Sequence, residues 1–274
     1  MRMPGRRTII IGLTAAVLAC CYASTLYGMA QQWWNDEDMG HGFLVPVVAG
    51  WILWRERGRW QTLPIAASAW GAPLILLGAL AHLAGVLGAG LFVSSAGFLI
   101  SVTGAILWLG GLPLLSAWAF PLFLCLFMLP KLAIVYNQAT LPLQLLASHL
   151  AAGMLSATGV GVIREGNILD VAGHRVLVAE ACNGIRYLLP LGFVGVLFAY
   201  LAHPAVWMRA VVLALAVPLA ILGNAVRVAV SAGVPALDSG TPHMAAGWII
   251  FVLSLAALVL ATRLLGRAPA RTHV

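Results

Sequence analysis

Long apolar runs, separated by short polar or charged segments, recur along the whole sequence. A helix that crosses a bilayer needs about 20 mostly apolar residues. The pattern predicts about eight such helices, over residues 8–29, 42–55, 69–87, 90–109, 113–130, 184–201, 209–231 and 244–265. We therefore expect an all-α integral membrane protein, folded as a single polytopic domain over residues 1–274.

The composition agrees with this class of protein. Of the residues, 62% are hydrophobic and 8% are charged, whereas a soluble domain carries about 25% charged residues. The formal net charge is +7, but the basic residues lie in short segments between apolar runs and form no continuous stripe with interleaved aromatic residues. The expected surroundings are therefore a lipid bilayer, and nucleic acid is not an expected partner.

The distribution of charge predicts the orientation in the membrane. With eight spans and a cytoplasmic N-terminus, ten of the fifteen basic residues fall on the cytoplasmic side, and seven of the eight acidic residues fall outside. Cytoplasmic loops are enriched in Lys and Arg, so we expect both termini in the cytoplasm. The first run, 8–29, exceeds the roughly 7–15 apolar residues of a signal peptide and is expected to remain as a span.

The longest segment between predicted spans, residues 131–183, is expected to be external. Its first half is moderately apolar and predicts a helix at the membrane surface, interrupted near Pro142. In its second half β-branched residues are frequent, and Ala172 and Gly173 suit a tight turn. This half predicts a small β-hairpin directly before the sixth span.

Cys182 lies where this hairpin ends and the sixth span begins, whereas the other three cysteines lie within apolar runs and suggest no disulfide framework. Asn183 is a good N-cap residue, and Arg186 follows one turn later. A helix N-terminus and a nearby cation both lower the pKa of a thiol, and the thiolate is the nucleophilic form. The alternative is a small buried cysteine at the start of a helix.

Between Ala210 and Gly233, within the seventh apolar run, Arg227 is the only charged residue. A charge within a span is costly and needs a partner or a wet cavity. The neighbouring Gly223 and Asn224 favour a packed polar site. The alternative is that Arg227 extends its side chain to the outer membrane surface.

His243 falls in the last external loop or in the first turn of the eighth span. The predicted topology places it with Cys182 and Arg227 on the outer side, at the outer ends of three consecutive spans. A thiol, a base and a cation that stabilises an oxyanion form a coherent set for acyl transfer. The alternative for His243 is an ordinary interfacial residue.

Two further residues are expected on the same side. Glu180 could orient His243 or bind substrate, and His41 in the first external loop could be a second base; the alternative for His41 is a loop residue at the interface. No metal site is expected, because Cys182 and His243 alone are no zinc ligand set and no H-E-x-x-H motif occurs.

Five short motifs follow one another along the chain: HGFLVPVVAGWILWRER (41–57), FPLFLCLFMLP (120–130), EACNGIR (180–186), GNAVR (223–227) and HMAAGW (243–248). In these motifs the chain resembles the exosortase/archaeosortase family over most of its length. The resemblance makes Cys182 the catalytic nucleophile, Arg227 the stabiliser of the oxyanion and His243 the general acid and base. The family commonly has Ser after the cysteine where this chain has Asn183, which leaves the subtype open.

The resemblance implies a cysteine protease or transpeptidase, without a cofactor, at the periplasmic face of the bacterial inner membrane. Its substrates would be secreted proteins with a C-terminal sorting tail of the PEP-CTERM type: a short Pro-Glu-Pro motif, a transmembrane helix and a basic cluster. Arg186 or Arg227 could pair with the acidic residue of that motif. Exopolysaccharide biosynthesis proteins are further implied partners.

Two other functions stay open at this point. A non-catalytic scaffold for exopolysaccharide assembly would tolerate replacement of Cys182. A transporter would line its pathway with Arg227, but transporters usually contain internal repeats, and this sequence contains none that we detect.

Overall fold

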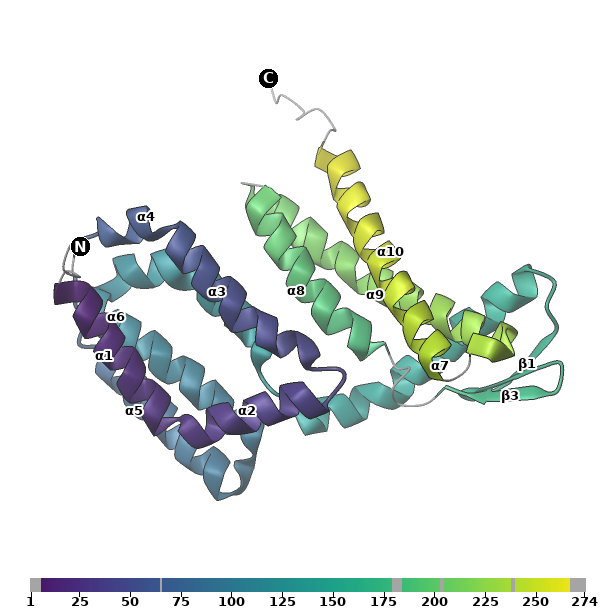
Figure 1. Ribbon diagram of the computed structural model, residues 1–274, viewed down its shortest axis with the longest axis horizontal. Coiled ribbons are helices and arrows are strands. Elements are labelled where there is room, and N and C mark those ends of the chain that lie inside the picture. The colour runs from purple at the N-terminus through teal and green to yellow at the C-terminus, as the bar shows by residue number, and fades with distance from the viewer. Residues whose placement is uncertain (1–5, 65, 179–183, 203–204, 238–239, 267–274) are drawn as a thin grey trace. The chain divides into compact units, whose positions relative to one another are not determined.

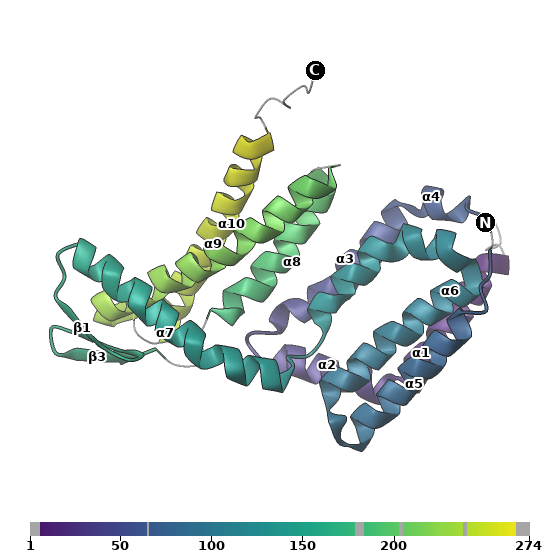
Figure 2. The same cartoon turned by 180° about the vertical axis from the view of Figure 1, so that it is seen from behind.

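The computed structural model describes residues 6–64, 66–178, 184–202, 205–237 and 240–266. These residues form long helices and one small antiparallel sheet (Figure 1, Figure 2). The chain divides into two compact units, Met1–Leu132 and Ala133–Val274. Each unit has its own set of packed elements.

The regular elements described in the N-terminal unit are all helices or helical turns. Its elements are α1 (Arg6–Cys21), α2 (Ala23–Asn35), the 3-10 turn η1 (Gly40–Phe43), α3 (Leu44–Arg55), α4 (Arg57–Gln61), α5 (Gly71–Ala84), the π-helical turn η2 (Gly85–Ala89), α6 (Leu91–Leu124) and the 3-10 turn η3 (Cys125–Met128).

The first predicted span, expected as one helix over residues 8–29, is instead two helices. Helices α1 and α2 are bent by 75° at Tyr22, whose φ of −102° and ψ of 15° leave the helical region. The Tyr22 hydroxyl lies 2.6 Å from the Ser101 hydroxyl of α6, and its ring stacks on His82 of α5 at 4.4 Å. These contacts fix Tyr22 on the α5–α6 pair and account for the bend.

The predicted breaks between the third, fourth and fifth spans are confirmed as backbone features. Gly88 and Gly90 have φ of 148° and 90° and reverse the chain between α5 and α6. Gly111, in the predicted gap between 109 and 113, has φ of 68° and ψ of −165° and kinks α6. These glycines are needed because residues with a Cβ atom rarely adopt such angles.

The structure contains several helices that could span a membrane, as an all-α membrane protein requires. Five helices are long and apolar enough to cross a membrane, or six if the bent α1–α2 pair is one span. One of them covers Leu91–Met128, 38 residues, which as a straight helix would be about twice as long as a bilayer core of roughly 30 Å. The kink at Gly111 therefore agrees with two crossings, while the count of eight spans and the cytoplasmic termini stay predictions.

The C-terminal unit combines helices with the sheet. Its elements are α7 (Ala133–Ala157), β1 (Val162–Glu165), β2 (Ile168–Val171), β3 (His174–Leu177), α8 (Ile185–Ala202), α9 (Val206–Gly233), the 3-10 turn η5 (Pro235–Leu237) and α10 (Gly240–Gly266).

Helix α7 corrects the expected interruption near Pro142. It continues through this proline for 25 residues. A proline removes one backbone hydrogen bond and crowds the preceding turn. The buried face of α7, which includes Ala147, Ala151 and Leu155, packs against the rest of the unit and keeps the helix continuous.

The predicted β-hairpin is confirmed, and the structure adds a strand to it. Ala172 and Gly173, with φ of 53° and 84°, form the two-residue turn between β2 and β3, in the geometry that suits tight hairpins. The stretch before this turn, expected as one strand, reverses at Gly166 (φ 64°) into β1 and β2. The result is an antiparallel sheet in the order β1-β2-β3.

The inner face of the sheet packs on α7 and α9. Alternate residues of the sheet, among them Leu169 and Val176, form one buried cluster with Ala151 of α7 and Val228 of α9. A second cluster joins α8, α9 and α10. Helix α9 therefore lies between the sheet on one side and the other two helices on the other, and it carries Arg227.

Candidate functional site

Arg227 is buried on α9, with 4% of its surface exposed. Its Nη2 atom lies 2.7 Å from Nε2 of His243 on α10. A guanidinium group only donates hydrogen bonds, so the imidazole accepts through this nitrogen. The structure thus brings together two of the three residues to which the sequence assigned catalysis, and it does so across two helices.

The other ring nitrogen of His243 settles which tautomer is present. Nδ1 lies 2.9 Å from the carbonyl oxygen of Leu237 and 3.2 Å from the hydroxyl of Ser231. A carbonyl oxygen only accepts, so Nδ1 carries the proton and Nε2 carries the lone pair that receives Arg227. Leu237 and Ser231 therefore hold the ring with its basic nitrogen turned to the guanidinium.

Residues of α8 and α10 also lie beside the guanidinium. The ring of Tyr187 lies 5.8 Å from its carbon, and the Tyr187 hydroxyl donates to the carbonyl of Gly247 at 3.1 Å. A Cβ atom on Gly247 would lie 3.5 Å from Nε of Arg227. An alanine here would therefore reach van der Waals contact with the guanidinium, and a glycine leaves this space open.

Two nitrogen atoms of Arg227, Nε and Nη1, are buried and have no hydrogen-bond partner among the described residues. Buried polar groups are almost always hydrogen-bonded, and an unsatisfied one costs about 1–3 kcal/mol. Donors held in this way are suited to an incoming carbonyl or an anion, which would relieve that cost.

Asn224 lies one turn before Arg227 on α9 and is buried. A Cβ atom on Gly184 would lie 3.4 Å from its side chain, and Gly184 itself has φ of 92°. The start of α8 therefore rests on Asn224, beside the Arg227 site. Arg186 follows in the first turn of α8 and is partly buried. The predicted Cys182, together with Asn183 and Glu180, lies outside the described residues.

His41 belongs to the N-terminal unit, where it is buried in η1. Its Nε2 atom lies 3.1 Å from the carbonyl oxygen of Phe127, to which it donates. Burial lowers the pKa of His41, and the backbone hydrogen bonds to Phe127 and Asp38 and the charge of Asp38 oppose this only in part. The role of a second base stays a prediction for this residue.

A compact ion-pair cluster lies next to His41. Lys131 is 2.7 Å from Asp36 and 2.9 Å from Asp38. Burial disfavours the charged ammonium, but hydrogen bonds and charges from both carboxylates outweigh it and raise the pKa of Lys131. The cluster ties the end of α2 to the segment after η3.

Sequence reasoning did not find Ser231, Tyr187 or Gly247. Ser231 follows Arg227 by four residues, so it lies on the same face of α9, and this spacing was a usable signal. Tyr187 and Gly247 owe their places to the packing of three helices, for which the sequence carries no local signal. Among the described residues, no group of three or more His, Cys, Asp or Glu side chains could hold a metal ion.

The described parts define a multi-pass membrane protein in which a buried arginine contacts a partly buried histidine. Residues 33–260 match the family described as transmembrane exosortase (Exosortase_EpsH), and the chain belongs to this family. Membership supports a membrane transpeptidase or protease role in general. No curated protein and no solved structure matches the chain.

Proposed function

We propose that this protein is a cysteine protease or transpeptidase of the bacterial inner membrane. It cleaves the C-terminal sorting tails, of the PEP-CTERM type, of secreted proteins at the periplasmic face. Family membership supports the class of reaction. The observation that carries the proposal is the buried guanidinium of Arg227, with one nitrogen on His243 and two donors without a described partner.

Cys182 is the proposed nucleophile, and chain connectivity supports its place at this site. It precedes Gly184 by two residues, so their Cα atoms are at most about 7.6 Å apart. Gly184 rests on Asn224, one turn from Arg227. The thiol therefore belongs to the chain segment that joins α8 beside the arginine.

The reaction divides into two acyl transfers. The Cys182 sulfur attacks the scissile carbonyl carbon, and Nε and Nη1 of Arg227 donate to the oxyanion that forms. The C–N bond breaks, and the amine of the anchor fragment leaves with the proton that His243 took from the thiol. Water, an amine or a hydroxyl group then attacks the thioester, and the proton that this nucleophile loses passes through His243 to the departing sulfur.

The observed hydrogen bonds impose one condition on this sequence of steps. Nε2 of His243 accepts from Nη2 of Arg227, so it can take a proton only after Nη2 has turned away. The developing oxyanion supplies the reason for this turn, because a charged acceptor attracts a guanidinium more strongly than a neutral imidazole does. Attack on the carbonyl and activation of the base are then one concerted step.

Capture of the thioester tests the proposed function. The purified full chain is incubated with a protein that ends in a Pro-Glu-Pro motif, a transmembrane helix and a basic cluster, and then with hydroxylamine. We expect a hydroxamate on the N-terminal fragment and, without hydroxylamine, an acyl adduct on the peptide that contains Cys182, both seen by mass spectrometry. An adduct on a residue other than Cys182 would contradict the proposal. So would cleavage without a detectable adduct by a variant that lacks Cys182.

A glycine on α10 offers a separate prediction. Gly247→Ala places a Cβ atom 3.3 Å from the Tyr187 hydroxyl and 3.5 Å from Nε of Arg227. We expect the added methyl group to displace the guanidinium and to raise the activation free energy by about 1.4 kcal/mol, which slows processing about tenfold. The thermal midpoint in detergent should hold, since alanine favours a helix over glycine by about 1 kcal/mol.

Gly153→Ala on α7 is the matched control, because a Cβ atom there has nothing within 4 Å. It should leave processing at the wild-type rate. Equal rates for Gly247→Ala and Gly153→Ala would mean that the space beside Arg227 has no part in the reaction.

A further inference from the structure

Strand β3 is one of the two outer strands of the described sheet. Its hydrogen bonds to β2 follow the antiparallel alternation, in which every second residue bonds to the neighbouring strand. The amide of Val178 donates to the carbonyl of Asn167 at 2.8 Å, which fixes the phase of this alternation. His174, Val176 and Val178 therefore bond to β2.

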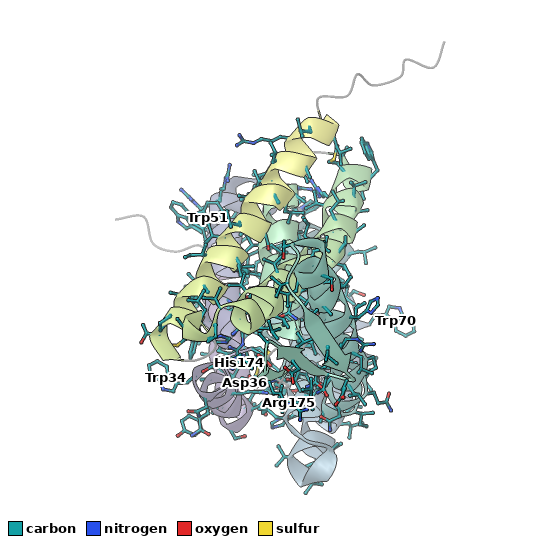
Figure 3. All side chains as sticks on the ribbon, turned by 90° about the vertical axis from the view of Figure 1, so that its right-hand side faces the viewer. Trp34, Asp36, Trp51, Trp70, His174 and Arg175 are labelled. Carbon is teal, nitrogen blue, oxygen red and sulfur yellow. The ribbon has the colours of Figure 1, made fainter. Side chains whose placement is uncertain are left out.

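The alternation turns the backbone groups of Arg175 and Leu177 away from the sheet. Neither residue has a backbone hydrogen bond to any described residue outside the β2–β3 ladder. Their side chains are exposed as well: the Arg175 side chain to 72% and Leu177 to 59%, and Figure 3 labels Arg175 and His174 on this strand. The edge thus presents two N–H and two C=O groups that can accept another strand.

The position of this edge connects it with the proposed site. Val176, on the inner face of β3, belongs to the same buried cluster as Val228, the residue next to Arg227 on α9. The chain also runs from Leu177 to Cys182 in five residues. A peptide lying on β3 therefore lies on the sheet that α9 supports, and on the strand that leads to the proposed nucleophile.

We propose that the edge of β3 binds the substrate segment before the scissile bond as an added strand. This inference rests on the proposed function and specifies how the same site holds its substrate. Edge strands commonly recognise extended peptides in this way, with affinity from main-chain hydrogen bonds. The added strand runs parallel to β3, so that the scissile bond lies beyond the C-terminal end of the strand that precedes Cys182 in the sequence.

The proposed Pro-Glu-Pro motif suits a strand that is bonded along one edge only. Proline has no N–H and occurs in sheets where its nitrogen faces solvent. With prolines at alternate positions, both face away from β3, and the backbone of the glutamate between them faces the edge. Arg175 of β3 already pairs with Asp170 of β2 at 3.1 Å, so the fit of the motif to this edge comes from its backbone pattern and not from charge.

A pair of proline substitutions tests the inference. Leu177→Pro removes one outward N–H and leaves the residues that bond to β2 unchanged. We expect KM to rise about tenfold with little change in kcat, the effect of losing roughly one or two hydrogen bonds. Arg164→Pro is the matched control, because its N–H faces outward on the opposite edge of the sheet, by the same alternation. It should change KM by less than about twofold, a size within the spread of surface substitutions.

A second measurement uses the substrate and leaves the sheet intact. Methylation of the glutamate nitrogen in the Pro-Glu-Pro motif removes the N–H that would face β3, and we expect the same rise in KM with the wild-type enzyme. A photo-cross-linking residue at position 177 of the Cys182→Ala protein should capture the substrate tail. The same residue at position 163, where Ile163 is exposed on β1, should not.

The outcomes separate this inference from the proposed function. If the wild type forms the thioester, but Leu177→Pro and the methylated substrate keep the normal KM and positions 177 and 163 cross-link equally, the edge does not bind the tail and the proposed function stands. If the wild type forms no thioester, the proposed function fails whatever the cross-links show.

Discussion

Cys182→Ala is expected to abolish processing of a co-expressed substrate with a sorting tail. Without the sulfur no thioester forms, and the amide bond faces only water and the remaining donors. Loss of a nucleophile lowers the rate by about a thousandfold or more in enzymes that act by acyl transfer. The measurement is the ratio of full-length to shortened substrate on a gel, with membrane insertion of the variant checked by fractionation.

The matched control for this experiment is Cys125→Ala. Cys125 lies in η3 of the N-terminal unit and is partly buried. The substitution therefore also removes a cysteine sulfur, but from a position with no proposed role in the reaction. Processing should stay within about twofold of the wild type, as expected when a substitution touches no part of the site. If Cys182→Ala processed substrate normally, a non-catalytic scaffold would be the better description.

The C-terminal spans illustrate what apolar patterns can predict. The runs 184–201, 209–231 and 244–265 correspond to α8, α9 and α10 within a few residues. Each run is long, nearly free of charge and bounded by polar or glycine-rich segments, and in lipid such a segment must form a helix to satisfy its backbone. Local composition is therefore sufficient for these elements.

Elsewhere the fold differs from what the local sequence predicts, because contacts with residues distant in the sequence determine the backbone conformation. The bend at Tyr22 depends on Ser101, 79 positions along the chain. The residues of the run 8–29 alone do not predict this bend. Helix α7 continues through Pro142 because its buried face packs on other elements. The reversal at Gly166 was visible as a glycine in a strand-like stretch, a known sign of a turn or bulge.

Part of the candidate site could be predicted from the sequence. Charge asymmetry placed Arg227 and His243 on one side of the membrane, and in the structure they are in contact. The tautomer of His243 was not accessible, because it depends on a carbonyl group of Leu237 and a hydroxyl of Ser231 that the fold brings to Nδ1. This detail changes the chemistry, since it shows that the basic nitrogen faces the arginine.

Arg227→Lys should lower kcat by about a hundredfold to a thousandfold, the loss seen when one oxyanion donor is removed. Lysine keeps the positive charge, but its single nitrogen replaces a planar fork. In the structure the three guanidinium nitrogens differ in their contacts. Nη2 donates to His243, while Nε and Nη1 have no hydrogen-bond partner among the described residues. One ammonium group cannot hold the imidazole and stabilise an oxyanion in both of these places.

The kinetic pattern distinguishes this role from a purely structural one. An interaction made only in the transition state lowers kcat and kcat/KM equally and leaves KM nearly unchanged. Arg209→Lys is the control, because Arg209 lies on the same helix and stacks on Tyr200 at 4.8 Å without any part in the site; it should keep the wild-type kcat. A normal kcat for Arg227→Lys would mean that charge alone suffices at this position, and the oxyanion role would have to be assigned to other donors.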